Sequence, residues 1–142
     1  MRTLTLLTLT CLTLATRAHS DVQSNMLGIW ETPDGDARIE IADCGDGTPC
    51  GDLVWVDPAS ADAQTDINNP KKALRDRPLL GIRMVWGFKL RGDKWRSGKV
   101  YDPESGRTYR AELTLVSANQ LKLKGCFGPI CRSQIWTRAI DP

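Results

Sequence analysis

Hydrophobic and polar residues alternate along most of the chain, which is the pattern of half-buried β-strands. The clearest run places an apolar residue at every second position from Leu80 to Leu90. A second run, from Tyr109 to Leu115, alternates apolar residues with Arg, Glu and Thr. Long stretches with helical periodicity are missing. The pattern therefore predicts an all-β protein.

Short turn signals divide this pattern into strands. Segments rich in Gly, Pro and Asp, such as 33–36 and 102–106, separate one apolar run from the next. We expect a single antiparallel meander that closes into a small barrel of about eight strands, because closure removes exposed strand edges. The predicted strands are 28–33, 37–43, 51–56, 79–90, 95–101, 107–116, 121–127 and 131–139.

One long connection, residues 57–78, has no strand pattern. Connections of this length are uncommon in a small β domain. We predict a short helix near Lys71 to Asp76 within it. The segment is interpreted as a lid or plug over one end of the barrel.

The first 20 residues have the features of a cleavable signal peptide. Arg2 precedes a short run rich in Leu and Thr, and the segment ends with the small-x-small sequence Ala18-His19-Ser20. The alternative is a buried or amphipathic N-terminal helix. We expect residues 21–142 to form one exported β-barrel domain, without a membrane span in the mature chain.

Removal of the leader changes what the composition permits. Arg2 and Arg17 leave with it, and 17 basic residues then balance 17 acidic ones, which argues against a nucleic-acid partner. The single histidine, His19, leaves as well. A Ser-His-Asp or Cys-His nucleophile and a His-ligated metal are then impossible. We expect a protein without a metal or cofactor, and binding is favoured over catalysis.

Charge is distributed unevenly along the mature chain. Residues 21–70 have a net charge of −10, and residues 71–142 have a net charge of +10. The two halves either interleave in the fold and neutralise each other, or they form a bipolar surface that recruits a charged partner. The sequence does not distinguish these two possibilities.

Four cysteines remain after the leader, and an even number in a small exported domain indicates disulfide bonds. Three pairings are possible. The simplest joins Cys44 to Cys50 and Cys126 to Cys131, because each pair closes a short loop that contains Gly and Pro.

Two short motifs at the ends of the predicted meander resemble those of the lipocalins and the wider calycin group. Gly28-Ile29-Trp30 opens the first predicted strand, and Trp136-Thr137-Arg138 closes the last one. Proteins of that group begin with Gly-x-Trp and end with an arginine that lies across the tryptophan. The resemblance implies that Arg138 stacks on Trp30 and closes one end of the barrel.

A longer stretch, from Gly28 to Arg138, resembles the bacterial domain-of-unknown-function family 2147. The match rests on segments such as 50–55, 66–70, 74–81, 98–103, 106–109 and 125–138. The resemblance implies a bacterial protein, periplasmic or secreted, with a calycin-like barrel. It implies no settled activity and no accepted catalytic residues.

Polar side chains concentrate between Asp66 and Gly81, and an arginine there can hold a carboxylate or phosphate by two hydrogen bonds. Alternatively, these residues tie the long connection down. We predict a pocket lined by the apolar faces of the strands at 79–90, 107–116 and 121–127, with the polar groups at its opening. The candidate ligand-binding residues are Asn68, Arg75, Arg77, Trp86 and Tyr109.

We therefore predict a non-enzymatic, exported barrel that binds a small hydrophobic or amphiphilic ligand. The alternative is an interaction or inhibitor protein that has a packed interior and acts in the envelope through a bipolar charged surface. A third hypothesis, an enzyme with carboxylates near Asp66 and Asp76, has no supporting motif. The sequence leaves the oligomeric state and the ligand's identity open.

Overall fold

The computed structural model describes residues 24–59 and 64–140. The predicted signal peptide, residues 1–20, lies outside the described residues. Within the described part, no helix has the length and apolar character needed to span a membrane. The described residues contain one short 3-10 helix, η1, over Lys72–Leu74, besides a helical turn over residues 24–26. Its strands are β1 (Gly28–Glu31), β2 (Ala37–Asp43), β3 (Pro49–Val56), β4 (Arg83–Trp86), β5 (Lys89–Arg91), β6 (Lys94–Asp102), β7 (Arg107–Ser117), β8 (Gln120–Phe127) and β9 (Ile130–Arg138).

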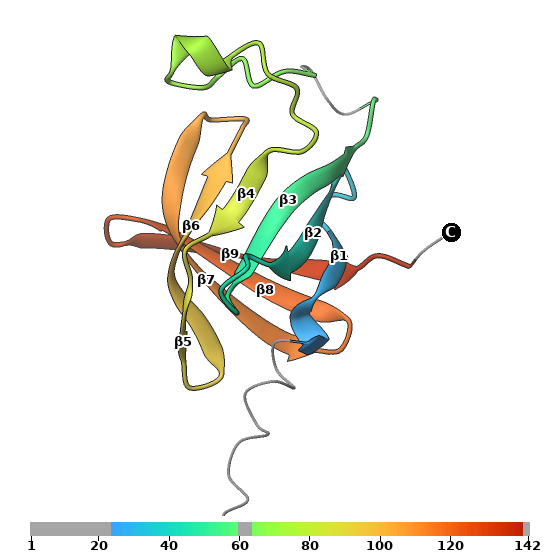
Figure 1. The fold of residues 1–142 in the computed structure, drawn as a ribbon, viewed down its shortest axis with the longest axis vertical. Coiled ribbons are helices and arrows are strands. Elements are labelled where there is room, and N and C mark those ends of the chain that lie inside the picture. Colours follow the sequence, from blue (N-terminus) through green and yellow to red (C-terminus); the bar gives the residue numbers. More distant parts are fainter. Residues whose placement is uncertain (1–23, 60–63, 141–142) are drawn as a thin grey trace, which may run out of the picture.

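The strands form an antiparallel meander that closes into an eight-stranded barrel (Figure 1). Their order is β4-β3-β2-β1-β9-β8-β7-β6-β5, and an additional pairing of β4 with β6 completes the ring. β5 pairs with β6 and lies beside the ring. The predicted all-β fold and its closed meander are confirmed. Closure pairs the strands of the ring with neighbours on both sides for part of their length.

The barrel interior is filled by apolar side chains from every side of the ring. Gly51 lies where three of them converge, and a Cβ atom there would approach Val85, Ile39 and Ile41 to 2.6–2.8 Å. The most deeply buried large side chains include Trp30, Ile39, Ile41, Leu113 and Leu121. The indole Nε1 of Trp95 is the one buried side-chain polar atom without a hydrogen-bond partner in the described part of the chain. The interior is thus a packed core.

The prediction of one continuous strand over 79–90 is wrong. Gly87 adopts a left-handed φ of +76° and separates β4 from β5, and Leu80 lies before β4 with 54% of its surface exposed. The alternation from Leu80 to Leu90 is therefore interrupted, and its members do not form one wall. The buried side chains of this segment fall on every third position instead: Ile82, Val85 and Phe88.

The two disulfides have the simplest pairing. Cys44–Cys50 joins the two sides of the β2–β3 turn, and Cys126–Cys131 links paired residues near the β8–β9 turn. Each bond therefore holds a hairpin end. Their presence is consistent with a location outside the cytoplasm, where disulfides persist.

Candidate functional site

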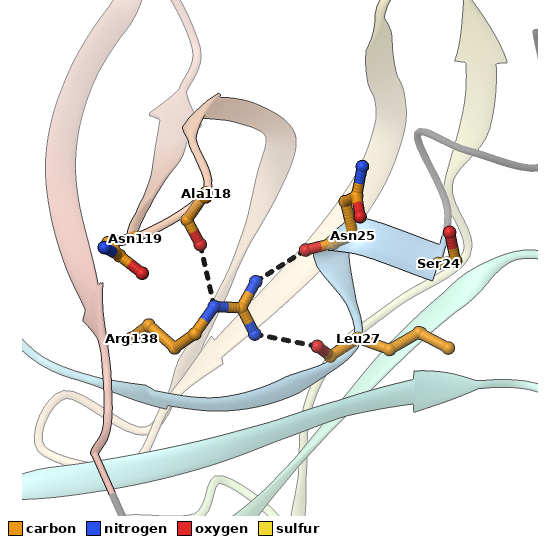
Figure 2. A pocket seen from close by; sticks show the side chains of 6 residues that line it. All are labelled: Ser24, Asn25, Leu27, Ala118, Asn119 and Arg138. Carbon is orange, nitrogen blue, oxygen red and sulfur yellow. Dashed lines mark hydrogen bonds between the residues drawn. The ribbon is translucent and has the colours of Figure 1, made fainter.

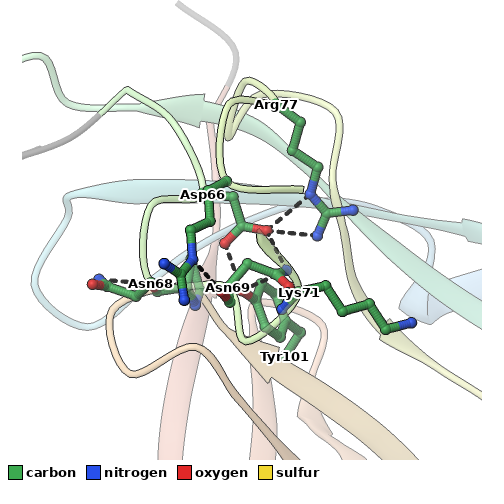
Figure 3. A network of polar contacts seen from close by, with 8 residues as sticks. Asp66, Asn68, Asn69, Lys71, Arg77 and Tyr101 are labelled. Atoms are coloured by element: carbon green, nitrogen blue, oxygen red, sulfur yellow. Dashed lines mark hydrogen bonds and ion pairs between the residues drawn. The ribbon is translucent and has the colours of Figure 1, made fainter. Parts of the chain in front are cut away.

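The long connection is organised around the buried carboxylate of Asp66 (Figure 3). Its Oδ1 accepts a hydrogen bond of 2.5 Å from the Tyr101 hydroxyl. Its Oδ2 accepts from Asn69 Nδ2 at 2.7 Å and from Arg77 Nε at 2.8 Å, while Arg77 Nη2 lies 2.7 Å away. Both oxygens are thus satisfied, and Arg77 compensates the buried charge.

Tyr101, on β6, is the barrel's contribution to this network. Its hydroxyl also accepts from Asn69 Nδ2 at 3.2 Å, and the Arg77 guanidinium lies 5.9 Å from its ring centre. Burial, followed by the hydrogen bond to Asp66, raises the pKa of Tyr101 to about 12. The phenol therefore stays protonated at neutral pH and serves as a donor to the carboxylate.

The connection is attached to the barrel at the β6–β7 turn. Asn68 Nδ2 donates to the carbonyl oxygens of Pro103 and Glu104, at 3.3 and 2.9 Å. The backbone of Asn68 approaches Gly106 so closely that a Cβ atom there would lie 1.9 Å from its carbonyl oxygen. Gly106 also has a φ of +66°. Only glycine fits this position without displacing the connection.

The connection and the barrel wall border an open pocket of about 450 Å³, which we call the loop pocket. Its lining carries three cationic side chains and none that is acidic. Arg77 is paired with Asp66 and Arg83 with Asp52, whereas the Lys71 ammonium makes no ion pair with a described residue. The lining residues are Asn69, Pro70, Lys71, Leu74, Arg77, Arg83, Trp86, Tyr101, Gly106 and Thr108.

The loop pocket borders the core at β4 and β6. Val85 pairs with Val100 and Trp86 with Lys99, and neighbouring side chains of a strand leave opposite faces. Trp86 therefore leaves β4 on the face opposite the buried Val85, whereas Arg83 shares the face of Val85. Trp86 packs against the core cluster, to which Tyr101 belongs. Of the three strands expected to line a pocket, 79–90 contributes Arg83 and Trp86, 107–116 contributes Thr108, and 121–127 contributes no lining residue.

Two of the five predicted ligand-binding residues, Arg77 and Trp86, line the loop pocket. The other three make contacts elsewhere. Asn68 holds the β6–β7 turn, Arg75 Nε donates to the Asn69 carbonyl oxygen at 2.8 Å, and Tyr109 packs edge-on against Phe127. These contacts of Asn68 and Arg75 tie the connection down.

Five polar lining residues are not among the candidates predicted from the sequence: Asn69, Lys71, Arg83, Tyr101 and Thr108. Asn69 and Lys71 belong to the polar segment between Asp66 and Gly81, but the sequence does not show which of its side chains turn inward. Tyr101 immediately precedes the Asp102-Pro103 turn signal, and this position at a strand end was the available clue. Arg83 had no signal, because it fell within the strand predicted over 79–90.

A second pocket, of about 300 Å³, lies at the opposite end of the barrel (Figures 1 and 2). There the Arg138 guanidinium lies 4.2 Å from the Trp30 ring centre. It donates to the carbonyl oxygens of Ala118, Asn25 and Leu27, at 2.7, 2.5 and 2.9 Å. All three guanidinium nitrogens thus donate to backbone carbonyl oxygens at the closed end of the barrel. We therefore do not assign Arg138 to ligand binding.

Opposite charges occupy different strands of the barrel. The acidic residues of the described chain up to Asp57 lie on β1, β2, β3 and their turns, with Arg38 as the one basic residue among them. Basic residues predominate on β5 to β9. The ion pair Arg83–Asp52 joins β4 to the acidic strand β3, and the pair Arg77–Asp66 lies within the long connection. Within residues 24–59 and 64–140, no three His, Cys, Asp or Glu side chains lie together as a set of metal ligands.

Comparison with solved structures defines the fold class. Protein HP1028 from the human pathogen Helicobacter pylori, described as belonging to the lipocalin family, matches with a TM-score of 0.69 and 22% sequence identity. The match covers 82% of this chain and 84% of that chain. The protein is therefore a lipocalin-like barrel.

The family is given by a second comparison. The model of the family described as "Uncharacterized protein conserved in bacteria (DUF2147)" matches residues 28–138. The chain belongs to this family, as the resemblance of its motifs indicated. A comparison with curated proteins gives no match.

Proposed function

We propose that the protein binds a small amphiphilic anion in the loop pocket. The observation that carries this proposal is the combination of an unpaired cation, Lys71, with an apolar floor that includes Leu74 and Trp86, in a space of about 450 Å³. Such a space accommodates a small molecule. An anionic headgroup would meet Lys71, and an apolar portion would lie against the indole.

Arg77 can donate a second hydrogen bond to the headgroup, and Asp66 holds its side chain in place whether or not a ligand is bound. Its Nε and Nη2 atoms are held by Asp66, and its Nη1 takes part in neither contact. The side chain is 37% exposed. An arginine fixed in this way offers a donor whose orientation is set before the ligand arrives, which reduces the entropy lost on binding.

The experiment uses 1-anilinonaphthalene-8-sulfonate, a fluorescent amphiphilic anion, and its uncharged analogue N-phenyl-1-naphthylamine. Lys71→Glu should weaken binding of the sulfonate about tenfold, because a charge-assisted contact is replaced by repulsion. Binding of the uncharged analogue should change little. Fluorescence titration measures both affinities.

The matched control is Lys72→Glu, since Lys72 is the adjacent exposed lysine and does not line the loop pocket. Equal weakening by the two variants would assign the effect to the general field of the protein, and the proposal would be wrong. The same follows if the wild-type protein binds neither probe. Trp86→Leu should weaken binding of both probes, because it removes part of the apolar floor.

Export belongs to the same proposal. The leader-like residues 1–20 and the two disulfides support a periplasmic or secreted protein. Mass spectrometry of the protein recovered from the periplasm should show a chain that begins at Asp21. It should also weigh about 4 Da less than its reduced form, one hydrogen for each bonded cysteine. Retention of the full-length chain in the cytoplasm with free thiols would contradict export.

A further inference from the structure

Strand β9 has a long edge without a neighbour among the described strands. On one side it pairs with β8 from Ile130 to Thr137. On the other side it pairs with β1 at Arg138 and Thr137 alone, because β1 ends at Glu31. Residues 130–136 therefore form an open sheet edge within the described part of the chain. Edges of this length are usually covered or blocked, since they accept additional strands.

The backbone groups along this edge can be assigned from the pairing. Ala139 N–H donates to the Ile29 carbonyl oxygen at 2.9 Å, so odd-numbered residues of this segment point toward the β1 side. Cys126 and Cys131 lie directly opposite with a Cα–Cα distance of 4.1 Å, the short spacing of a pair that exchanges no backbone hydrogen bonds. The N–H and C=O groups of Cys131, Ser133 and Ile135 therefore point away from β8.

Side chains beside the open edge combine apolar surface with positive charge. Phe127 and Ile130, at the β8–β9 turn, are 64% and 69% exposed, and Ile135 is 39% exposed. β8 and β9 contain no acidic residue. Their basic residues near the edge are Lys122, Lys124 and Arg132.

We propose that the open edge of β9 binds an extended, acidic segment of a partner protein, which joins the barrel as a further strand. Backbone hydrogen bonds to Cys131, Ser133 and Ile135 would supply the affinity, and the flanking side chains the specificity. An acidic residue would lie beside Arg132, and an apolar residue beside Ile135 on the opposite face. This site is separate from the loop pocket.

Charge argues against a second copy of this chain as the occupant. If the β9 edges of two copies paired, the basic residues of β8 and β9 in one copy would face those of the other copy. Neither strand contains an acidic residue that could neutralise them. Like charges on neighbouring strands destabilise a sheet. A foreign acidic strand meets the same groups with opposite charge.

The test uses two short probe peptides, one of alternating valine and glutamate and one of alternating valine and lysine. Amide hydrogen exchange, followed by NMR, should slow at Cys131, Ser133 and Ile135 when the glutamate peptide binds. The amides of Arg132 and Gln134, which already face β8, should change little. The lysine peptide should leave all of these rates unchanged.

Two substitutions at Ser133 separate strand addition from other binding. Ser133→Pro removes one outward N–H at an edge, where proline is tolerated, and should weaken binding of the glutamate peptide about tenfold. Ser133→Ala keeps the N–H and should bind like the wild type. Equal binding by the proline variant, or equal binding of both peptides to the wild type, would overturn the proposal.

A third variant keeps the test decisive if Ser133→Pro does not fold. Arg132→Glu alters an exposed side chain and should weaken binding of the glutamate peptide about tenfold. Unchanged binding would overturn the proposal, as would the absence of binding to the wild type. Self-association of the wild type that Ser133→Pro abolishes would identify the edge as an interface between copies and would also overturn it.

Discussion

At the scale of single residues, the buried carboxylate of Asp66 explains how a connection with little regular structure keeps a defined shape. Its four donor contacts come from Asn69, Arg77 and Tyr101, and so bring two parts of the connection onto β6. Removal of any one donor leaves the buried charge less well compensated. The loop pocket depends on this arrangement, because Arg77, Asn69 and Tyr101 all line it.

Tyr101 should give the protein a specific sensitivity to alkaline pH. Its pKa rises from 10.0 to about 12 in the fold, first through burial and then through Asp66. The neutral phenol is thus favoured in the folded state. Its contribution to stability is fully present below pH 10 and is lost as the pH rises toward 12. Urea unfolding at a series of pH values measures this loss.

Tyr101→Phe isolates that contribution from the lysines that titrate in the same range. The variant should be less stable than the wild type at neutral pH by about 1–3 kcal/mol, because Asp66 loses a buried donor. The difference between the two proteins should narrow above pH 10. A constant difference up to pH 12 would show that Tyr101 ionises as freely in the folded protein as in the unfolded chain.

At this scale the sequence predicted part of the site. Arg77 and Trp86 were identified because arginine and tryptophan are suited to anions and apolar groups wherever they lie. Asn68 was chosen although its neighbour Asn69 lines the pocket. The backbone of the connection decides which of the two adjacent asparagines faces the pocket. Because this backbone is irregular, the alternation of side chains seen in strands does not predict it.

At the scale of elements, the alternating pattern predicted the meander because each strand has one face on the core. The prediction failed for 79–90, where the residue pattern continues through Gly81 and Gly87 but the backbone does not. Both glycines adopt positive φ values, and a sequence does not distinguish a glycine of this kind from one in an extended strand. The loop pocket lies beside this broken segment.

Gly106 should be more sensitive to substitution than a glycine of the same backbone conformation elsewhere. Gly106 and Gly92 have φ values of +66° and +64°, but a Cβ atom would clash with Asn68 at the former and meet nothing within 4 Å at the latter. Gly92→Ala should cost about 1–2 kcal/mol for the backbone strain alone. Gly106→Ala should cost about 1–3 kcal/mol more, through overpacking.

Thermal unfolding of both variants measures this difference, and titration with anilinonaphthalene sulfonate reports on the loop pocket. Gly106→Ala should also weaken probe binding, because the connection must move away from the β6–β7 turn. Equal stability of the two variants would mean that the backbone at Asn68 moves away from the new Cβ atom without a loss of unfolding free energy. The close approach would then have no role in shaping the pocket.

At the scale of the whole molecule, the barrel is closed by two pairings between strands that do not follow one another in the sequence. β1 meets β9 through Trp30 and Arg138, and β4 meets β6 through Val85 and Trp86. Each pairing is short. Side chains add further contacts where β1 meets β9. Arg138 joins the N-terminal segment to the β7–β8 turn there (Figure 2).

Arg138→Lys tests whether charge alone closes the barrel. Lysine keeps the positive charge but presents a single ammonium group, which cannot reach the carbonyl oxygens of Ala118, Asn25 and Leu27 together. It also loses the planar stack on Trp30. We expect a decrease of about 2–3 kcal/mol in the free energy of unfolding and a weaker near-ultraviolet circular dichroism signal from tryptophan. The control is Arg91→Lys, on the exposed strand β5, which should leave the free energy of unfolding and the tryptophan signal unchanged. Equal stability of the two variants would show that the β1–β9 pairing closes the barrel without the guanidinium.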